Sequence, residues 1–178
     1  GPNGIAPTDR GILVAEYGND RIVLVDPETR TVKAAFGDLG SEPGKPSRFY
    51  GPAGLAIGPQ RIVVADSCNH KVQVFNSEGK HLFNIGPFGA DSATHFSYPT
   101  GVVCLEDGGF AVSDTENNRV QVFDADGRFV RSIGGPDAPE AHRVNNPLGL
   151  GVDGQHRLYV CDCGNDSVKI FTSEGELL

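Results

Sequence analysis

One phrase occurs four times in this chain of 178 residues, and its spacing restricts the fold more than any other feature. Each copy has a short apolar run that ends at an acidic residue, an asparagine three positions later and a second apolar run. Successive copies lie 50, 48 and 48 residues apart, measured between the acidic residues Glu16, Asp66, Asp114 and Asp162. A fixed period of this length is typical of solenoids, arrays and propellers.

The pattern inside each copy favours the propeller. Apolar residues alternate or form short β-branched runs, and turns such as "EDGG" and "DADG" interrupt them, whereas no segment keeps helical spacing. Each unit therefore offers about four strands. The first follows a Pro-x-Gly, the second ends at the acidic residue, the third is a run such as Val-Gln-Val-Phe, and the fourth is a segment such as His81 to Ile85. Four strands in a unit of this length predict a propeller blade.

The same residues resemble a known family. The order Pro-x-Gly, a strand ending in Val-x-Asp, then Asn-x-Arg-Val-Gln-Val-Phe-Asp, a glycine turn and a strand closing in Ile-Gly resembles the NHL repeat, the blade unit of NHL β-propellers. The copy from Pro99 to Gly134 fits best, whereas Glu16 replaces aspartate in the first copy and Ser167 replaces a basic residue in the fourth. The resemblance covers essentially the whole chain. It implies an all-β, NHL-type β-propeller with four repeats of four-stranded antiparallel blades, at about residues 1–37, 52–86, 99–134 and 147–178.

The last repeat differs from the others at its end. Only three residues follow Gly175, whereas a full fourth strand follows Gly79 and Gly127. NHL wheels usually carry more than four blades, so we expect part of a larger wheel; a closed ring of four is the alternative. The absence of methionine also indicates an excised piece. Because an open arc exposes two sheet faces that normally pack on neighbours, we expect dimers formed through these blade flanks.

The recurring polar residues have a structural interpretation. The aspartate ends the second strand, where we expect it to accept backbone N–H groups of the turn that follows. The asparagine tolerates a left-handed conformation in that turn, and the basic residue lies near the acid. We therefore assign a scaffold role, with contact to a partner as the alternative, to Asp66, Asn69, Lys71, Asp114, Asn117, Arg119, Asp162 and Asn165.

Residues that differ between copies are better candidates for function, because loops at one rim of a scaffold carry binding residues. The loops between blades share the conventional top face with the turns between second and third strands, and they read "SRFYGP", "THFSYP" and "HRVNNP". We expect Phe49, Phe96 and Val144 to plug the spaces between blades. The predicted binding face consists of Arg48, Tyr50, His70, His95, Tyr98, Arg143 and Asn145.

Charge restricts the choice of partner. The formal net charge of −8 disfavours sequence-independent nucleic-acid binding, because phosphate contacts need clustered cations. Acidic residues gather on the rim opposite the top face, which leaves the top face nearly neutral, with cations among tyrosines and asparagines. Such a face suits a protein or peptide target and does not exclude a single-stranded or stem-loop RNA whose bases rest on aromatic rings. No apolar run is long enough to suggest a membrane partner.

The resemblance also implies a role. NHL proteins of the tripartite-motif type are ubiquitin ligases whose propeller recruits protein or RNA targets by its top face. A non-catalytic recognition module of that kind, within a ligase or a post-transcriptional regulator, is therefore expected. The RING and coiled-coil parts would lie outside this sequence, which contains no RING-like cysteine spacing.

A catalytic propeller is the main alternative. Some NHL propellers are metal-dependent lyases, but the five histidines of this chain do not recur at one inner-strand position, so we expect no metal, no cofactor and no catalysis. Cys161 and Cys163 align with small residues, Cys104 with a core position, and Cys68 lies in a loop. Free thiols fit a reducing compartment, so we expect a cytoplasmic protein. An extracellular sensor domain is a further alternative.

Overall fold

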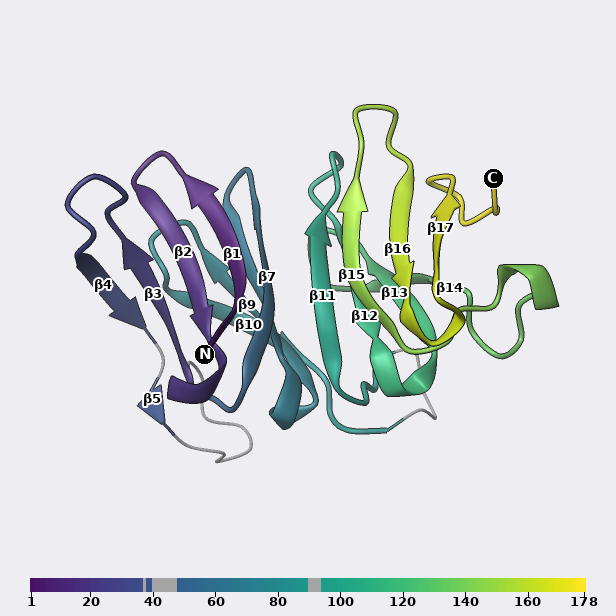
Figure 1. Ribbon diagram of the computed structural model, residues 1–178, viewed down its shortest axis with the longest axis horizontal. Helices are drawn as coiled ribbons and strands as arrows, with labels where there is room; N and C mark the ends of the chain where they lie inside the picture. The colour runs from purple at the N-terminus through teal and green to yellow at the C-terminus, as the bar shows by residue number, and fades with distance from the viewer. Residues whose placement is uncertain (37, 40–47, 90–93) are drawn as a thin grey trace.

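The computed structural model describes residues 1–36, 38–39, 48–89 and 94–178. Four antiparallel sheets follow one another along the chain and are arranged as the blades of a four-blade β-propeller (Figure 1). This all-β architecture confirms the fold class predicted from the repeats. We number the blades one to four in chain order.

The strands occur at corresponding positions of the repeats. Blade one contains β1 (Pro2–Thr8), β2 (Gly11–Glu16), β3 (Arg21–Val25) and β4 (Val32–Phe36). Blade two contains β7 (Pro52–Gly58), β8 (Arg61–Asp66), β9 (Lys71–Asn76) and β10 (His81–Ile85). Blade three contains β11 (Pro99–Cys104), β12 (Phe110–Asp114), β13 (Arg119–Phe123) and β14 (Phe129–Ile133). Two short strands, β5 (Asp38–Leu39) and β6 (Arg48–Phe49), pair in parallel between blades one and two.

Blade four has three strands where the repeat pattern predicts four. These are β15 (Pro147–Val152), β16 (Leu158–Asp162) and β17 (Ser167–Phe171). Leu177 forms an isolated antiparallel bridge to Phe171, at the place where a fourth strand starts in the other blades. Three residues of the given sequence follow Gly175.

A short 3-10 turn joins the second strand to the third in every blade. These turns are η1 (Tyr17–Asn19), η2 (Ser67–Asn69), η3 (Thr115–Asn117) and η5 (Cys163–Asn165). The left-handed residue is the one after the recurring asparagine of each phrase: Asp20, His70, Asn118 and Asp166, with φ between 48° and 52°. The expectation that the asparagine itself is left-handed was therefore wrong, because the asparagine side chain is used to donate to the acid while the next residue reverses the chain.

The Pro-x-Gly element has a steric cause. A Cβ on Gly54 would lie 2.1 Å from the carbonyl oxygen of Thr100, and a Cβ on Gly101 would lie 2.1 Å from that of Leu148. Each inner strand thus approaches the next blade's inner strand so closely that a side chain is excluded. Accordingly β1 packs on β7, β7 on β11 and β11 on β15.

Apolar side chains fill the spaces between successive blades in three clusters. Phe49, Phe96 and Val144 are all buried in these clusters, as expected for plugs between blades. Blades one and four lie at opposite ends of the view in Figure 1, and in the described part of the chain no comparable packing joins β1 to β15. The first and last blades therefore each keep one open face.

Candidate binding face

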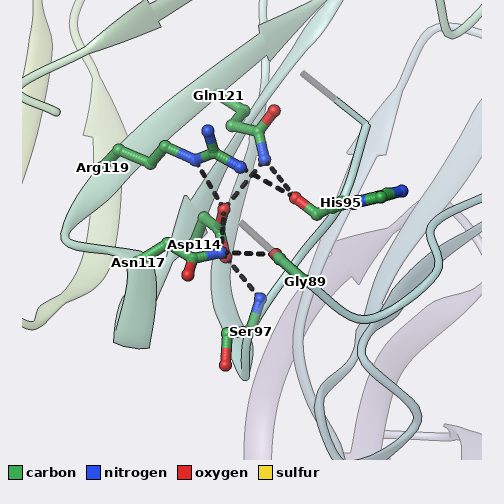
Figure 2. A network of polar contacts seen from close by, with 7 residues as sticks. All are labelled: Gly89, His95, Ser97, Asp114, Asn117, Arg119 and Gln121. Atoms are coloured by element: carbon green, nitrogen blue, oxygen red, sulfur yellow. Dashed lines mark hydrogen bonds and ion pairs between the residues drawn. The ribbon is translucent and has the colours of Figure 1, made fainter. Parts of the chain in front are cut away.

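The 3-10 turns and the loops between blades lie on one rim, the lower side of Figure 1. We call this rim the top face, following the convention for propellers. A network centred on Asp114 anchors it in blade three (Figure 2). Asp114 is fully buried at the end of β12, and its carboxylate accepts from Arg119 Nε at 2.7 Å, Gln121 Nε2 at 2.9 Å and Asn117 Nδ2 at 2.9 Å. Four donors converge on it, because Ser97 N also donates at 2.7 Å.

The backbone donor to each aspartate comes from the loop that precedes the blade. Tyr50 N donates to Asp66 at 2.7 Å, as Ser97 N does to Asp114, and Asn145 N donates to Asp162 at 2.6 Å. The expectation that the following turn supplies this N–H was wrong, because the strand end points the carboxylate back toward the incoming loop. The aspartate therefore fixes the inter-blade loop as well as its own turn.

Blade two repeats the network with Lys71 in place of Arg119, whereas in blade four Ser167 stands at the position of Arg119 and Lys169 at that of Gln121. Asn69, Gln73 and Lys71 surround Asp66, with Lys71 Nζ at 3.5 Å. Burial raises the pKa of Asp66, and these hydrogen bonds and Lys71 oppose that shift.

In blade four Asn165 Nδ2 donates to Asp162 at 2.9 Å, and Lys169 Nζ lies 3.5 Å from the same carboxylate. In blade one the more exposed Glu16 pairs with Arg21, which lowers the pKa of that carboxyl. The residues to which the sequence assigned a scaffold role therefore all lie in the networks around Asp66, Asp114 and Asp162.

A second set of contacts ties each turn to the next inter-blade loop. Asp20 accepts from Gly51 N at 2.7 Å and Asn118 accepts from Asn146 N at 2.7 Å. Between them, His70 Nδ1 accepts from Tyr98 N at 3.1 Å. His70, which the sequence placed in the binding face, thus has a structural contact of its own, and burial lowers its pKa.

Aromatic side chains gather over blades one to three on the top face. We call Tyr17, Tyr50, His70, Phe88 and Tyr98 the aromatic patch. The His70 ring lies 4.5 Å from that of Phe88 and 5.2 Å from that of Tyr98. The tyrosines and Phe88 are each at least one-third exposed.

Cys68 lies between two of these tyrosines. Its Sγ is 3.3 Å from the Tyr17 hydroxyl and 3.7 Å from the Tyr98 hydroxyl. The Cys68 contact and partial burial raise the pKa of Tyr17 to about 12. The patch is therefore held by contacts between three blades.

The other predicted binding residues lie outside the patch. Arg48 is half-buried, and its carbonyl accepts from Gln73. The His95 carbonyl accepts from Arg119 and Gln121, so its backbone belongs to the Asp114 network (Figure 2).

Arg143 and Asn145 are exposed and line a separate open groove between blades three and four, together with Glu140 and Lys169. Arg143 Nε donates to the Ala138 carbonyl at 3.0 Å, and Asn145 Nδ2 donates to the Gly164 carbonyl. The structure thus brings Tyr50, His70 and Tyr98 together and places Arg143 and Asn145 elsewhere on the same rim.

Sequence reasoning missed Tyr17, Phe88 and Cys68. Tyr17 directly follows Glu16, and Cys68 lies two residues after Asp66. Both lie in the turns between second and third strands, which the repeat pattern places on the same rim as the loops between blades. That shared rim was the signal that could have found them. Phe88 lies in a loop whose length varies among the copies, and no pattern marked it.

Histidines and cysteines do not converge within the described ranges, where no group of three or more His, Cys, Asp or Glu side chains could hold a metal ion. His156 pairs with Glu106 on the opposite rim, and His81 contacts Asn84 on the outer strand β10. All four cysteines are free thiols, and burial raises the pKa of Cys104 to about 11. No helix among the described residues is long and apolar enough to cross a membrane.

Comparison with known proteins identifies the repeats. The family model described as "NHL repeat" matches residues 49–75 and 96–123. Two of the four repeats are therefore similar to the NHL repeat. Both NHL matches run from an inter-blade plug, Phe49 or Phe96, to the end of the third strand and so include a complete aspartate network. The NHL matches do not extend to the repeats in which Glu16 and Ser167 depart from the motif.

One curated protein is similar in part of its sequence, and several solved structures share the fold. Protein brain tumor of Drosophila melanogaster is 35% identical over 75 residues, which are 42% of this chain and 7% of that protein. Virginiamycin B lyase from Staphylococcus aureus aligns with a TM-score of 0.75 at 16% identity, over 100% of this chain and 54% of the lyase chain. Hydrazine synthase from Kuenenia stuttgartiensis aligns with a TM-score of 0.73 at 16% identity, over 100% and 48%. The chain thus spans about half of each solved structure, and this likeness concerns the fold alone.

Proposed function

We propose that the chain is a non-catalytic recognition module that binds a protein or peptide segment on the aromatic patch of its top face. The observation that carries the proposal is the exposure of Tyr17, Tyr50, Phe88 and Tyr98 around a partly buried thiol. Exposed aromatic rings that neighbouring contacts hold in place bury a large area at low entropic cost when a partner docks.

The engagement of the top-face cations favours a protein target over RNA. Arg119 donates to Asp114 and the His95 carbonyl, and Arg143 Nε donates to the Ala138 carbonyl. Lys169 Nζ donates to the Ala141 carbonyl at 3.0 Å and lies near Asp162. Because cations engaged with their own protein lose affinity for phosphates, and the net charge is −8, the electrostatic contribution to RNA binding is small.

RNA binding is the second candidate, and a specific feature supports it. Tyrosine and phenylalanine faces stack on unpaired bases at roughly 1–3 kcal/mol per base. The two candidates differ in their sensitivity to salt, because only phosphate contacts release counterions.

We further propose that the module recruits substrates for a ubiquitin ligase of the tripartite-motif type or for a post-transcriptional regulator, and that it acts in the cytoplasm. The NHL repeats and the four free thiols support this setting. A metal-dependent lyase has less support, because the histidines lie apart on different rims.

The test compares proteins and RNA retained from a cell lysate by the immobilised chain and by a double variant, Tyr50→Asn with Tyr98→Asn. Asparagine stands at the corresponding positions of the last loop, as Asn145 and Asn146, and it accepts the left-handed backbone that Tyr98 adopts. The substitutions therefore remove two rings and preserve the loops.

We expect the double variant to lose the proteins that the unchanged chain retains, with RNase treatment leaving wild-type retention intact. Leu82→Ala, an exposed apolar position on the outer strand β10, is the control and should retain them. Retention that disappears with RNase would favour the RNA candidate. If the double variant retains the same proteins as the unchanged chain, the aromatic patch is not the binding site.

A further inference from the structure

A recess lies between blades three and four on the rim opposite the top face, the upper side of Figure 1. It is a hollow of about 230 Å³, and its apolar walls include Val122, Ile133 and Leu158, each at most 3% exposed. Polar side chains from the turns of both blades complete the lining. The hollow therefore combines buried apolar walls with polar groups.

The same recess occurs at each junction, and one position of the outer strand decides what fills it. This position is Ala34 in β4, Phe83 in β10 and Arg131 in β14. Between blades two and three, Phe83 packs against the buried cluster that contains Phe110. Between blades three and four the residues at these two positions are Arg131 and Leu158, so both rings are absent and space remains.

The walls of this recess come from parts of the repeat that all the blades contain. At the junction of blades one and two, the corresponding hollow is lined as far as the turn from Ser77 to Gly79. No residue of β10, which the structure describes completely, lines that hollow. Thr172 and Ser173 belong to the same turn of blade four and line the recess there. The outer strand of the later blade is therefore not needed to form it.

Arg131 brings an unused hydrogen-bond donor to the recess. Its Nη2 donates to the Ser173 carbonyl, as Arg61 donates to the corresponding Ala125 carbonyl at the preceding junction, so the side chain is held across the two blades. Its Nε is buried and has no hydrogen-bond partner among the residues that the structure describes. Because a buried donor without an acceptor destabilises the fold, a ligand oxygen that reaches Nε gains a favourable contact.

Acidic side chains restrict the charge of a ligand in this recess. Glu106 and Asp107 line it from a turn of blade three, and both are exposed. His156 of blade four approaches Glu106, with Nε2 2.9 Å from Oε2. Two carboxylates disfavour an anion, and the guanidinium of Arg131 disfavours a cation, so an uncharged ligand fits best.

We propose that the recess binds a small, uncharged molecule that consists of one aromatic ring with a hydroxyl group. The ring takes the place that Phe83 fills at the preceding junction, and the hydroxyl oxygen accepts from Arg131 Nε. An apolar cavity of about 150 Å³ is large enough for benzene, so a hollow of about 230 Å³ holds a phenol. The recess and the aromatic patch lie on opposite rims, so this site is independent of the proposed function.

The test titrates the isotope-labelled chain with 4-methylphenol at neutral pH and follows the amide signals by nuclear magnetic resonance. We expect saturable shifts at Glu106, Arg131 and Ser173. Toluene, which has the ring and no hydroxyl, should bind about tenfold more weakly, because a hydrogen bond to a charged group is lost. An anion of similar size, 4-methylbenzoate, should also bind more weakly than 4-methylphenol.

Two substitutions at one position separate the ring from the hydrogen bond. Arg131→Phe introduces the residue that fills the preceding recess, so it should abolish binding of all three probes. Arg131→Met keeps an unbranched apolar stem and removes the guanidinium, so 4-methylphenol should bind this variant as weakly as toluene binds the unchanged chain. Ala34→Phe fills the recess between blades one and two, so it is the control and should bind 4-methylphenol normally. Circular dichroism checks the folding of each variant.

The same titrations can overturn the proposal. Undiminished binding of 4-methylphenol to Arg131→Phe would place the ring elsewhere, and undiminished binding to Arg131→Met would show that Nε is not the donor. The double variant Tyr50→Asn with Tyr98→Asn should bind normally, and its failure to bind would assign the ring to the aromatic patch instead. Tighter binding of 4-methylbenzoate would contradict an uncharged ligand. An unchanged chain without saturable shifts would contradict the site itself.

Discussion

Arg119 Nε lies 2.7 Å from Oδ2 of Asp114, a fully buried carboxylate, and the Arg119 side chain is itself mostly buried. In blade one the corresponding pair, Arg21 and Glu16, is more exposed, with side-chain exposures of 42% and 23%. Removing the acid should reduce the stability of the fold more in the buried pair than in the exposed pair. Only the buried cation would then lack both its counterion and contact with water.

The first prediction compares these two pairs. Asp114→Asn should lower the free energy of unfolding by about 3–5 kcal/mol, because it leaves the buried guanidinium of Arg119 without its counterion. Glu16→Gln should lower it by less than about 1 kcal/mol. Urea unfolding followed by circular dichroism measures both. Equal losses in the two variants would show that burial of the acid does not set the strength of the network.

A second prediction concerns the contact between His70 and Tyr98. His70 Nδ1 accepts the Tyr98 N–H, so the ring must be neutral, and burial lowers the pKa of His70 from 6.5, against the opposing effect of Glu116 and Asp114. A lowered folded-state pKa means that the unfolded chain binds the proton more readily. The stability that His70 contributes is therefore present above pH 6.5 and declines as the pH falls through the folded-state pKa.

The matched variant for this effect is His70→Asn. Asn118 makes the same contact to the next loop at the equivalent position, so asparagine should keep the link without a titrating group. We expect the difference in unfolding free energy between the unchanged chain and His70→Asn to vary with pH below 6.5 and to be constant above it. A difference that is constant across this range would rule out protonation of His70 as the cause.

The repeats allowed the architecture to be predicted because blade packing depends on local patterns. The alternation in segments such as Val120 to Phe123 and the glycine of Pro-x-Gly each specify a contact that recurs in every blade. The plugs Phe49 and Phe96 could be recognised for the same reason, since both precede an inner strand by the same number of residues.

The details of the top face could not be predicted in the same way, because they depend on contacts between blades. Nothing in the sequence near Cys68 indicates that Tyr17 and Tyr98, which are 51 and 30 residues away, lie on either side of its thiol. The donor to Asp66 was misassigned for the same reason, because Tyr50 N is distant in sequence from the strand end that it contacts. Such pairings follow from the rotation of one blade against the next.

A third prediction uses the cysteines as reporters. Cys104 packs against the core between blades two and three, and burial raises its pKa to about 11, so it should be the slowest thiol to react. Cys161 and Cys163 are exposed and should react first. Alkylation of the folded chain at neutral pH, followed by peptide mass spectrometry, gives the order. Rapid labelling of Cys104 would indicate that the junction of blades two and three opens readily.

The last prediction concerns a recess between blades on the rim opposite the top face. At the junction of blades two and three, Phe83 from β10 fills this recess and lies beneath the turn at Gly127, where a Cβ would meet its ring at 2.4 Å. The corresponding residue of β4 is Ala34, and a hollow of about 440 Å³ remains at the junction of blades one and two. Phenylalanine at position 34 should therefore fill existing space.

We expect Ala34→Phe to raise the free energy of unfolding by about 1 kcal/mol, the usual gain from filling a cavity. Phe83→Ala should lower it by about 2 kcal/mol, less than for a fully buried ring, because Phe83 is partly exposed. Ala35→Phe is the control, since Ala35 lies on the other face of β4, opposite Val23, and should give no gain. Thermal and urea unfolding at a concentration where the chain is monomeric measure all three. Destabilisation by Ala34→Phe would mean that the two junctions differ in backbone spacing as well as in side-chain size.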